Sequence, residues 1–157
     1  MRRVMTDCYA CLRNQTPSKE LPPRELVFDD GNWRVVHAFG SAIPGWLVVV
    51  CRLHITSMSQ LTPQEATVVG PLLSTLSGAL EDVLGARKAY VAFLAEAKGL
   101  EHLHVHMVPR KEDMPPEQRG KRVFDWLDMP KGEAMTDGEA DRIALDLRPL
   151  VTREMSY

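Results

Sequence analysis

The chain has 157 residues, of which 45% are apolar and 25% are charged, and its formal net charge is −2. These values are typical of one globular domain, and they exclude a disordered chain and disfavour a nonspecific binder of nucleic acids or membrane surfaces. The longest apolar run, residues 46–51, is too short to span a bilayer. Residues 1–7 contain two arginines without an apolar segment behind them, so we expect no secretory signal and a cytoplasmic protein.

A β-hairpin and a third strand are predicted in the first third of the chain. Residues 25–28 and 33–39 are rich in β-branched and aromatic side chains, and they flank the turn sequence Asp29-Asp30-Gly31-Asn32. The turn Pro44-Gly45 then leads into residues 46–51. The β-branched residues of this run predict a strand that is buried on both faces.

A long helix is predicted to begin at Pro63 and to end before Gly85. Thr62 is placed as the N-cap, Pro63 as the first helical residue and Glu65 as the partner in a capping box. Pro71 is expected to kink the helix. Apolar residues recur at the helical spacing of three and four positions: Val69, Leu72, Leu73, Leu76, Leu80, Val83 and Leu84.

Two more strands are predicted over residues 88–95 and 101–109, and a C-terminal helix begins at about Thr136. One face of that helix is apolar, with Ile143, Leu147, Leu150 and Val151. Together these elements predict an α+β fold with a five-stranded, mostly antiparallel sheet. The long helix connects the third and fourth strands, and the second helix follows the fifth.

Three of the five histidines, His102, His104 and His106, alternate with apolar residues in the last predicted strand. Side chains alternate between the faces of a strand, so we expect these imidazoles to form a row with neighbours about 7 Å apart. Such a row suits a three-histidine metal site, or a nucleophilic imidazole with a second imidazole beside it to move protons. The spacing alone does not choose between them.

The segment Cys8-Tyr9-Ala10-Cys11 is ambiguous on its own. A redox motif of this kind follows a strand, and no strand is predicted before Cys8, so redox chemistry is disfavoured. As half of a zinc site the pair needs two more ligands, and histidines are the usual complement. Two buried thiols without a metal are the other alternative. We interpret Cys51 as a small core residue and His37 as structural.

The segment from His102 to Arg110 resembles the signature of the histidine triad nucleotide hydrolases and transferases. The resemblance extends over the cysteine pair, the hairpin, the third strand and the long helix, about residues 8–110. The remaining residues, 111–157, are then a C-terminal extension of a single domain over 1–157. The resemblance implies a cytoplasmic homodimer that attacks the α-phosphorus of a nucleotide through a covalent nucleotidyl-histidine. The implied substrates are nucleoside phosphoramidates or dinucleoside polyphosphates.

The resemblance also implies residue roles. His104 matches the central histidine, which is the nucleophile, and His106 would bind the phosphate and serve the leaving group. Bacterial members often bind structural zinc through two cysteines, the histidine after the third strand and the first histidine of the triad. In this chain these ligands would be Cys8, Cys11, His54 and His102.

The sequence departs from the family at three places. Many members have Gly-His where this chain has Gly45-Trp46, and that histidine commonly supports the triad from behind; we expect Trp46 to be a core aromatic. Many members have an acidic residue before this turn that bonds the ribose, and residues 34–45 contain no Asp or Glu. The segment Ala97-Lys98-Gly99 replaces a polar element that contacts the phosphate and leaving group.

A phosphoryl site needs positive charge to offset the charge on its oxygens. Lys98 and Arg110 are the candidates, and we expect Lys98, Gly99 and Arg110 to contact the substrate. Two alternative functions stay open at this point. One is a metallohydrolase in which all three histidines bind a catalytic metal, and the other is a non-catalytic nucleotide-binding regulator on the same fold.

Overall fold

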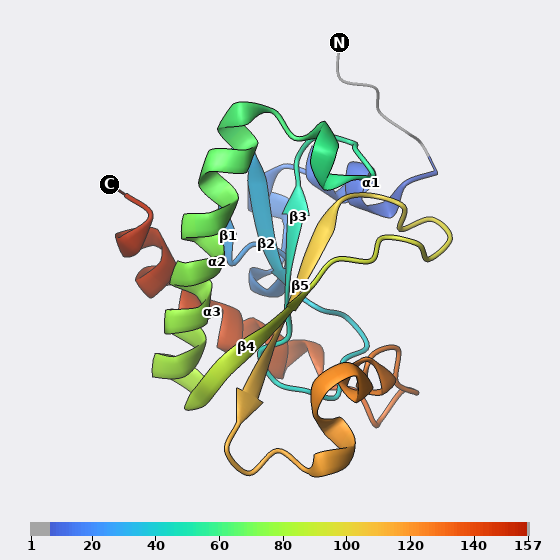
Figure 1. Cartoon of the computed structure of the whole chain (residues 1–157), viewed down its shortest axis with the longest axis vertical. Coiled ribbons are helices and arrows are strands. Elements are labelled where there is room, and N and C mark those ends of the chain that lie inside the picture. Colours follow the sequence, from blue (N-terminus) through green and yellow to red (C-terminus); the bar gives the residue numbers. More distant parts are fainter. Residues whose placement is uncertain (1–6, 157) are drawn as a thin grey trace.

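The computed structural model describes residues 7–156 and contains one five-stranded sheet in this range (Figure 1). The strands run in the spatial order β1-β2-β3-β5-β4, and every neighbouring pair is antiparallel. The strands are β1 (Phe28–Asp29), β2 (Trp33–His37), β3 (Leu47–Cys51), β4 (Ala86–Ala92) and β5 (His104–Lys111). The helices are α1 (Tyr9–Gln15), α2 (Pro63–Leu84) and α3 (Asp137–Glu154). The predicted α+β fold is therefore confirmed.

The ends of several strands differ from the prediction. The first strand was expected over residues 25–28, but Pro23–Glu25 form a 3₁₀ turn, η2, and only Phe28–Asp29 pair with β2. The fourth strand starts directly after Gly85 and ends at Ala92 rather than Ala95. The fifth strand begins at His104 rather than at residue 101. Before it, the N–H of Leu103 donates to the carbonyl of Ile55, outside the sheet ladder.

The predicted bounds of α2 and the predicted start of α3 are confirmed by their caps. Thr62 forms a capping box with Glu65 at the start of α2, and Gly85 ends it in the left-handed conformation with φ 66°. The helix continues through Pro71. Thr136 forms the corresponding capping box at the start of α3. These signals involve residues three or four positions apart, which is why the sequence reveals them.

The two faces of the sheet are covered by different parts of the chain. On one face α2 and α3 pack on a large core that includes Val49, Cys51 and Met107. The small core role predicted for Cys51 is confirmed, because this residue is fully buried there. On the other face, the segment that follows β5 packs against Trp46 and Val108, with its 3₁₀ helix η5 (Gly120–Trp126). Strand β5 therefore lies between two apolar clusters.

No helix within residues 7–156 is both long enough and apolar enough to span a bilayer. Residues 1–6, where the sequence analysis expects no secretory signal, lie outside the described part of the chain.

Candidate active site and metal cluster

The three histidines of the motif do not form one row, because His104 and His106 pair with each other and His102 pairs with His54. His104 and His106 lie on β5 on the face away from α2, with ring centroids 4.9 Å apart. His102 precedes the strand, is fully buried, and has its ring centroid 5.1 Å from that of His54. The expected row of three is therefore wrong, because the strand begins only at His104. This arrangement separates a possible metal ligand from two possible catalytic groups.

His104 has a defined tautomer. Its Nδ1 lies 2.7 Å from the backbone carbonyl oxygen of His102. A carbonyl oxygen can only accept, so Nδ1 carries the proton and Nε2 carries the lone pair. Burial lowers the pKa of His104 below its ordinary value, an effect that the bond to His102 opposes. The ring is therefore neutral at pH 7 and offers Nε2 as a nucleophile.

His106 is enclosed by aromatic rings. Its side chain is buried, and its ring makes edge contacts with Trp46 of the turn before β3 and with Phe124 of η5. The indole Nε1–H of Trp46 donates to His106 Nδ1 at 3.0 Å. Burial, followed by the proximity of His104, lowers the pKa of His106 to about 4. This imidazole is neutral at physiological pH.

Four side chains at the start of β5 form a cluster with the composition of a zinc site. The potential ligand atoms of Cys8, Cys11, His54 and His102 all lie within 4.8 Å of one another. Cys8 Sγ is 3.4 Å from His102 Nδ1, and Cys11 Sγ and His102 Nδ1 are each 3.2 Å from His54 Nδ1. Ligand atoms of a tetrahedral zinc site lie about 3.3–3.8 Å apart, as its bond lengths require. The donor set and spacing fit a zinc ion.

The orientation of His102 also suits a metal ligand. Its Nε2 lies 2.6 Å from the carbonyl oxygen of Cys51, so Nε2–H donates and Nδ1 presents its lone pair to the cluster. Cys8 caps α1, and its Sγ accepts the N–H of Cys11 one turn later, which places both thiols on one side. Within the described residues, no close group of potential metal ligands includes His104 or His106.

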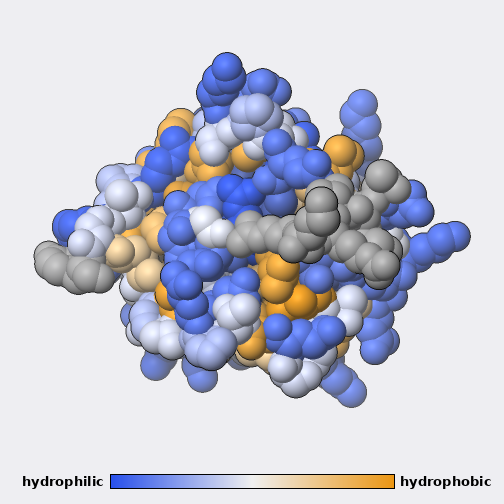
Figure 2. All heavy atoms as spheres, turned by 90° about the horizontal axis from the view of Figure 1, so that it is seen from above, coloured by the Kyte–Doolittle hydropathy of each residue, from blue (hydrophilic) through white to orange (hydrophobic). Residues whose placement is uncertain are grey.

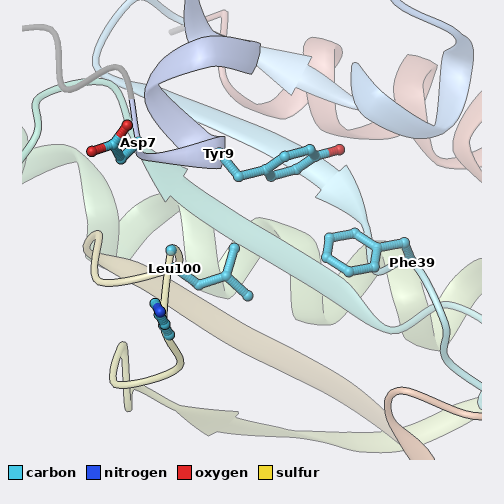
Figure 3. Close-up of a pocket in the computed structure, with 6 residues that line it drawn as sticks. Asp7, Tyr9, Phe39 and Leu100 are labelled. Carbon is cyan, nitrogen blue, oxygen red and sulfur yellow. The ribbon is translucent and has the colours of Figure 1, made fainter.

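A pocket of about 460 Å³ opens on the face of the sheet away from α2, and its lining includes neither His104 nor His106 (Figure 3). Tyr9 and Phe39 approach each other at its rim, with ring centroids 5.7 Å apart and an edge-to-face geometry. Lys98 and Gly99 both line it, as the sequence analysis expects of substrate contacts. The complete lining is Asp7, Tyr9, Phe39, Lys98, Gly99 and Leu100. Seen from above, the surface is largely hydrophilic, with apolar side chains in a few patches (Figure 2).

Arg110 does not line this pocket. It lies six residues beyond His104 on β5, about 20 Å along an extended strand. Its guanidinium donates to the carbonyl oxygen of Lys111. The structural role predicted for His37 agrees with its contacts, since Nδ1–H donates to the carbonyl of Ala38 and Nε2 accepts the N–H of Gly45.

Three residues of the site were not predicted from the sequence. Tyr9 could have been suspected, because it lies between the two cysteines of the predicted metal site. Phe39 and Phe124 come from a loop and from the C-terminal segment, and no local pattern relates them to the histidines. Trp46 was expected in the core and is fully buried there, but its hydrogen bond to His106 was not foreseen.

A model of the HIT domain family matches residues 19–113. A zinc-bound histidine triad family protein from Mycobacterium smegmatis is similar in structure, with a TM-score of 0.64 and 15% identity over 93% of this chain and 94% of that one. A histidine triad protein from Bradyrhizobium japonicum has a TM-score of 0.65 and 20% identity over 80% and 88%. Among curated protein sequences, none matches this chain.

A third solved structure, diadenosine triphosphate hydrolase from Plasmodium falciparum in complex with cyclomarin A, has a TM-score of 0.63 and 11% identity. The match covers 87% of this chain and 82% of that one. At these identities the solved structures establish a common fold. The match to the family covers more than half of the chain and carries the histidine motif, so the chain belongs to the HIT, or histidine triad, family.

Proposed function

We propose that this protein is a nucleotide hydrolase or nucleotidyl transferase in which His104 Nε2 attacks the α-phosphorus of a nucleotide with a leaving group. Its substrates are nucleoside phosphoramidates or dinucleoside polyphosphates. The observation that carries the proposal is the bond from His104 Nδ1–H to the His102 carbonyl. It holds the proton away from Nε2 and orients the ring, as covalent catalysis by a neutral imidazole requires.

The reaction has two steps. First, a bond forms between His104 Nε2 and phosphorus while the bond from phosphorus to the leaving group breaks, and the leaving group takes the electron pair. Then water or another acceptor attacks phosphorus, the P–N bond breaks, and the electron pair returns to Nε2 while the attacking group loses its proton to solvent. His106 is next to His104 and binds the phosphate and serves the leaving group.

The pocket lined by Tyr9, Phe39 and Lys98 is the binding site for the nucleotide in this proposal. Its volume of about 460 Å³ lies in the range of small-molecule sites. Tyr9 and Phe39 provide aromatic surface for a base, and Lys98 provides positive charge near the phosphates. Gly99 lines the pocket with its backbone and no side chain, so a ligand can approach closely.

Zinc bound by Cys8, Cys11, His54 and His102 is a structural ion in this proposal. The ion would cross-link α1 to the segment that enters β5 and thereby fix the position of His104. It takes no part in the phosphoryl steps.

Residues 1–157 form one histidine triad domain in this proposal, and the extension after Arg110 is packed on its sheet. The cytoplasmic location expected from the sequence stays a prediction. A homodimer is also proposed, because β4 is an edge strand and Val91 is 52% exposed on it. Sedimentation at micromolar concentration should report a dimer, and Val91→Glu should weaken it. Leu145→Glu, a change at an exposed residue of α3, is the matched control and should leave the dimer unchanged.

Trapping of the intermediate tests the proposed function. The protein is mixed with adenylyl and guanylyl phosphoramidates and dinucleoside polyphosphates labelled at the α-phosphorus, and the reaction is stopped without acid. We expect turnover, and label on the peptide that contains His104. Turnover that depends on a metal and leaves no label would instead identify a metallohydrolase. Tight product binding without turnover would identify a regulator, and either result overturns the proposal.

A further inference from the structure

Trp46 makes a polar contact with the catalytic pair that its role as a core aromatic does not require. It is fully buried, and its indole Nε1–H donates to His106 Nδ1 at 3.0 Å. The residues are 60 positions apart in the sequence and lie on neighbouring elements, since Val48 of β3 pairs with His106 of β5. The ring of Phe124 makes edge contacts with both Trp46 and His106.

The chemistry of the two rings determines where the proton of His106 lies. Indole nitrogen is a donor and has no lone pair to offer. His106 Nδ1 must therefore accept, and the proton of the neutral ring lies on Nε2. A doubly protonated ring would place its own Nδ1–H against the N–H of Trp46 and lose this hydrogen bond. Phe124 covers the pair, so water cannot readily replace Trp46 as the partner.

We propose that Trp46 is a positioning residue that holds His106 as the neutral Nε2–H tautomer, and that the site therefore favours leaving groups that depart as anions. The inference rests on the proposed function and narrows its substrate class to nucleotidyl anhydrides, such as dinucleoside polyphosphates. His106 then supplies a hydrogen bond from Nε2–H and does not transfer a proton.

The two candidate substrates differ in what the leaving group needs. When the bond from the α-phosphorus to a bridging oxygen breaks, the departing phosphate oxygen keeps the electron pair and is stable as an anion at neutral pH. When a P–N bond breaks, the departing amine nitrogen takes the electron pair and must gain a proton. A neutral imidazole could give up Nε2–H only by becoming an imidazolate, which lies far outside the range of biological acids.

The surroundings of His106 support this restriction. The titratable side chain in ring contact with it is His104, whose Nε2 must itself be unprotonated to attack. From the neighbouring strands, the pairing partners of His106 are Val48 and Ala92, and from η5 the contact is Phe124. Each of these three side chains is apolar. None can accept a proton or carries a negative charge that would pair with a cationic imidazole.

Nitrogen NMR of the histidine rings in the wild-type protein tests the tautomer without any variant. We expect His106 to show an unprotonated Nδ1 and a protonated Nε2 at pH 7. In Trp46→Phe, which keeps an aromatic ring and removes the N–H, the two tautomers should become mixed. Protonated Nδ1 in the wild type would overturn the proposal.

Substrate preference tests the consequence. The ratio of kcat/KM for an adenylyl anhydride to that for an adenylyl phosphoramidate should favour the anhydride in the wild type. Trp46→His provides a ring that can accept a proton from Nδ1–H, so it permits a cationic His106. We expect this variant to shift the ratio toward the phosphoramidate by about a hundredfold, the lower end of what a positioned general acid contributes. An unchanged ratio in a folded Trp46→His protein would overturn the leaving-group part.

Trp33→Phe is the matched control. Trp33 is also fully buried and its Nε1–H donates to a carbonyl, that of Glu65, on the opposite face of the sheet. Its loss should lower stability and leave both the His106 tautomer and the substrate ratio unchanged. Absence of turnover on both substrates would overturn the proposed function and the leaving-group part. The NMR result would then decide the role of Trp46 by itself.

Discussion

The two neighbours of His104 in the motif, His102 and His106, are both buried, yet their rings are held in opposite ways. At His102 a carbonyl accepts the Nε2–H, and this turns the Nδ1 lone pair toward the cysteines and His54. At His106 an indole N–H donates to Nδ1, and this leaves a proton on Nε2. In the proposed function, one residue type thus serves as a metal ligand at one position and as a hydrogen-bond donor at the other. The difference lies in the partner rather than in the histidine.

The partners also come from different parts of the chain. The polar cluster around His102 is built by α1 and the loop after β3, which precede the motif. The aromatic enclosure of His106 includes Phe124 from the segment that follows it. His104 lies between these two environments and makes its own bond to the backbone. Substitutions near His102 and substitutions near His106 should therefore have separate effects.

Removal of the central imidazole should have the largest effect on activity. His104→Gly and His104→Asn should lower kcat by about 10³-fold or more, because the group that forms the covalent bond is lost. The temperature of unfolding and the affinity for a nucleotide product should change little, since the lost interaction forms in the transition state. Activity above about a hundredth of the wild-type value would contradict the nucleophilic role.

Loss of a ligand at the His102 end should affect stability more than chemistry. Protein purified without chelator should contain about one zinc per chain. Cys8→Ser should lower the zinc content, and it should lower the free energy of unfolding by at least about 3 kcal/mol. Cys51→Ala is the control at the third cysteine. It removes buried packing and should keep the zinc, because the bond to His102 comes from its backbone. Full zinc content in Cys8→Ser would contradict the proposed site.

The sequence was sufficient for the features that depend on near neighbours. The starts of α2 and α3 lie at capping residues three positions apart, and the alternation of His104 and His106 follows from the geometry of a strand. The start of β5 was not predictable in this way, since it depends on the bond from Leu103 to Ile55. The role of Trp46 depends on a partner 60 residues away.

Acid should destabilise the His106 end in a defined pH window. The pKa of His106 is about 4 in the folded protein and about 6.5 when unfolded, so the unfolded chain binds more protons between these values. The contribution of His106 to the free energy of unfolding is fully present above pH 6.5. It decreases by up to about 3 kcal/mol as the pH falls toward 4. Urea unfolding should show this loss, and His106→Gln should reduce it. An equal loss in both proteins would assign the effect to another group.

The smallest expected effect distinguishes Lys98 from Arg110, two residues that were both expected from the sequence to contact the substrate. Lys98 lines the pocket, whereas the guanidinium of Arg110 donates to a backbone carbonyl at the far end of β5. Lys98→Ala should raise KM about tenfold with little change in kcat, because a charge that binds the phosphates in both the ground and transition states is lost. Arg110→Ala should leave KM within about twofold, as expected for a charge about 20 Å away in screening salt. Steady-state kinetics measures both. If Arg110→Ala had the larger effect on KM, the nucleotide would have to extend along β5 away from the pocket, and the placement of the base against Tyr9 and Phe39 would be wrong.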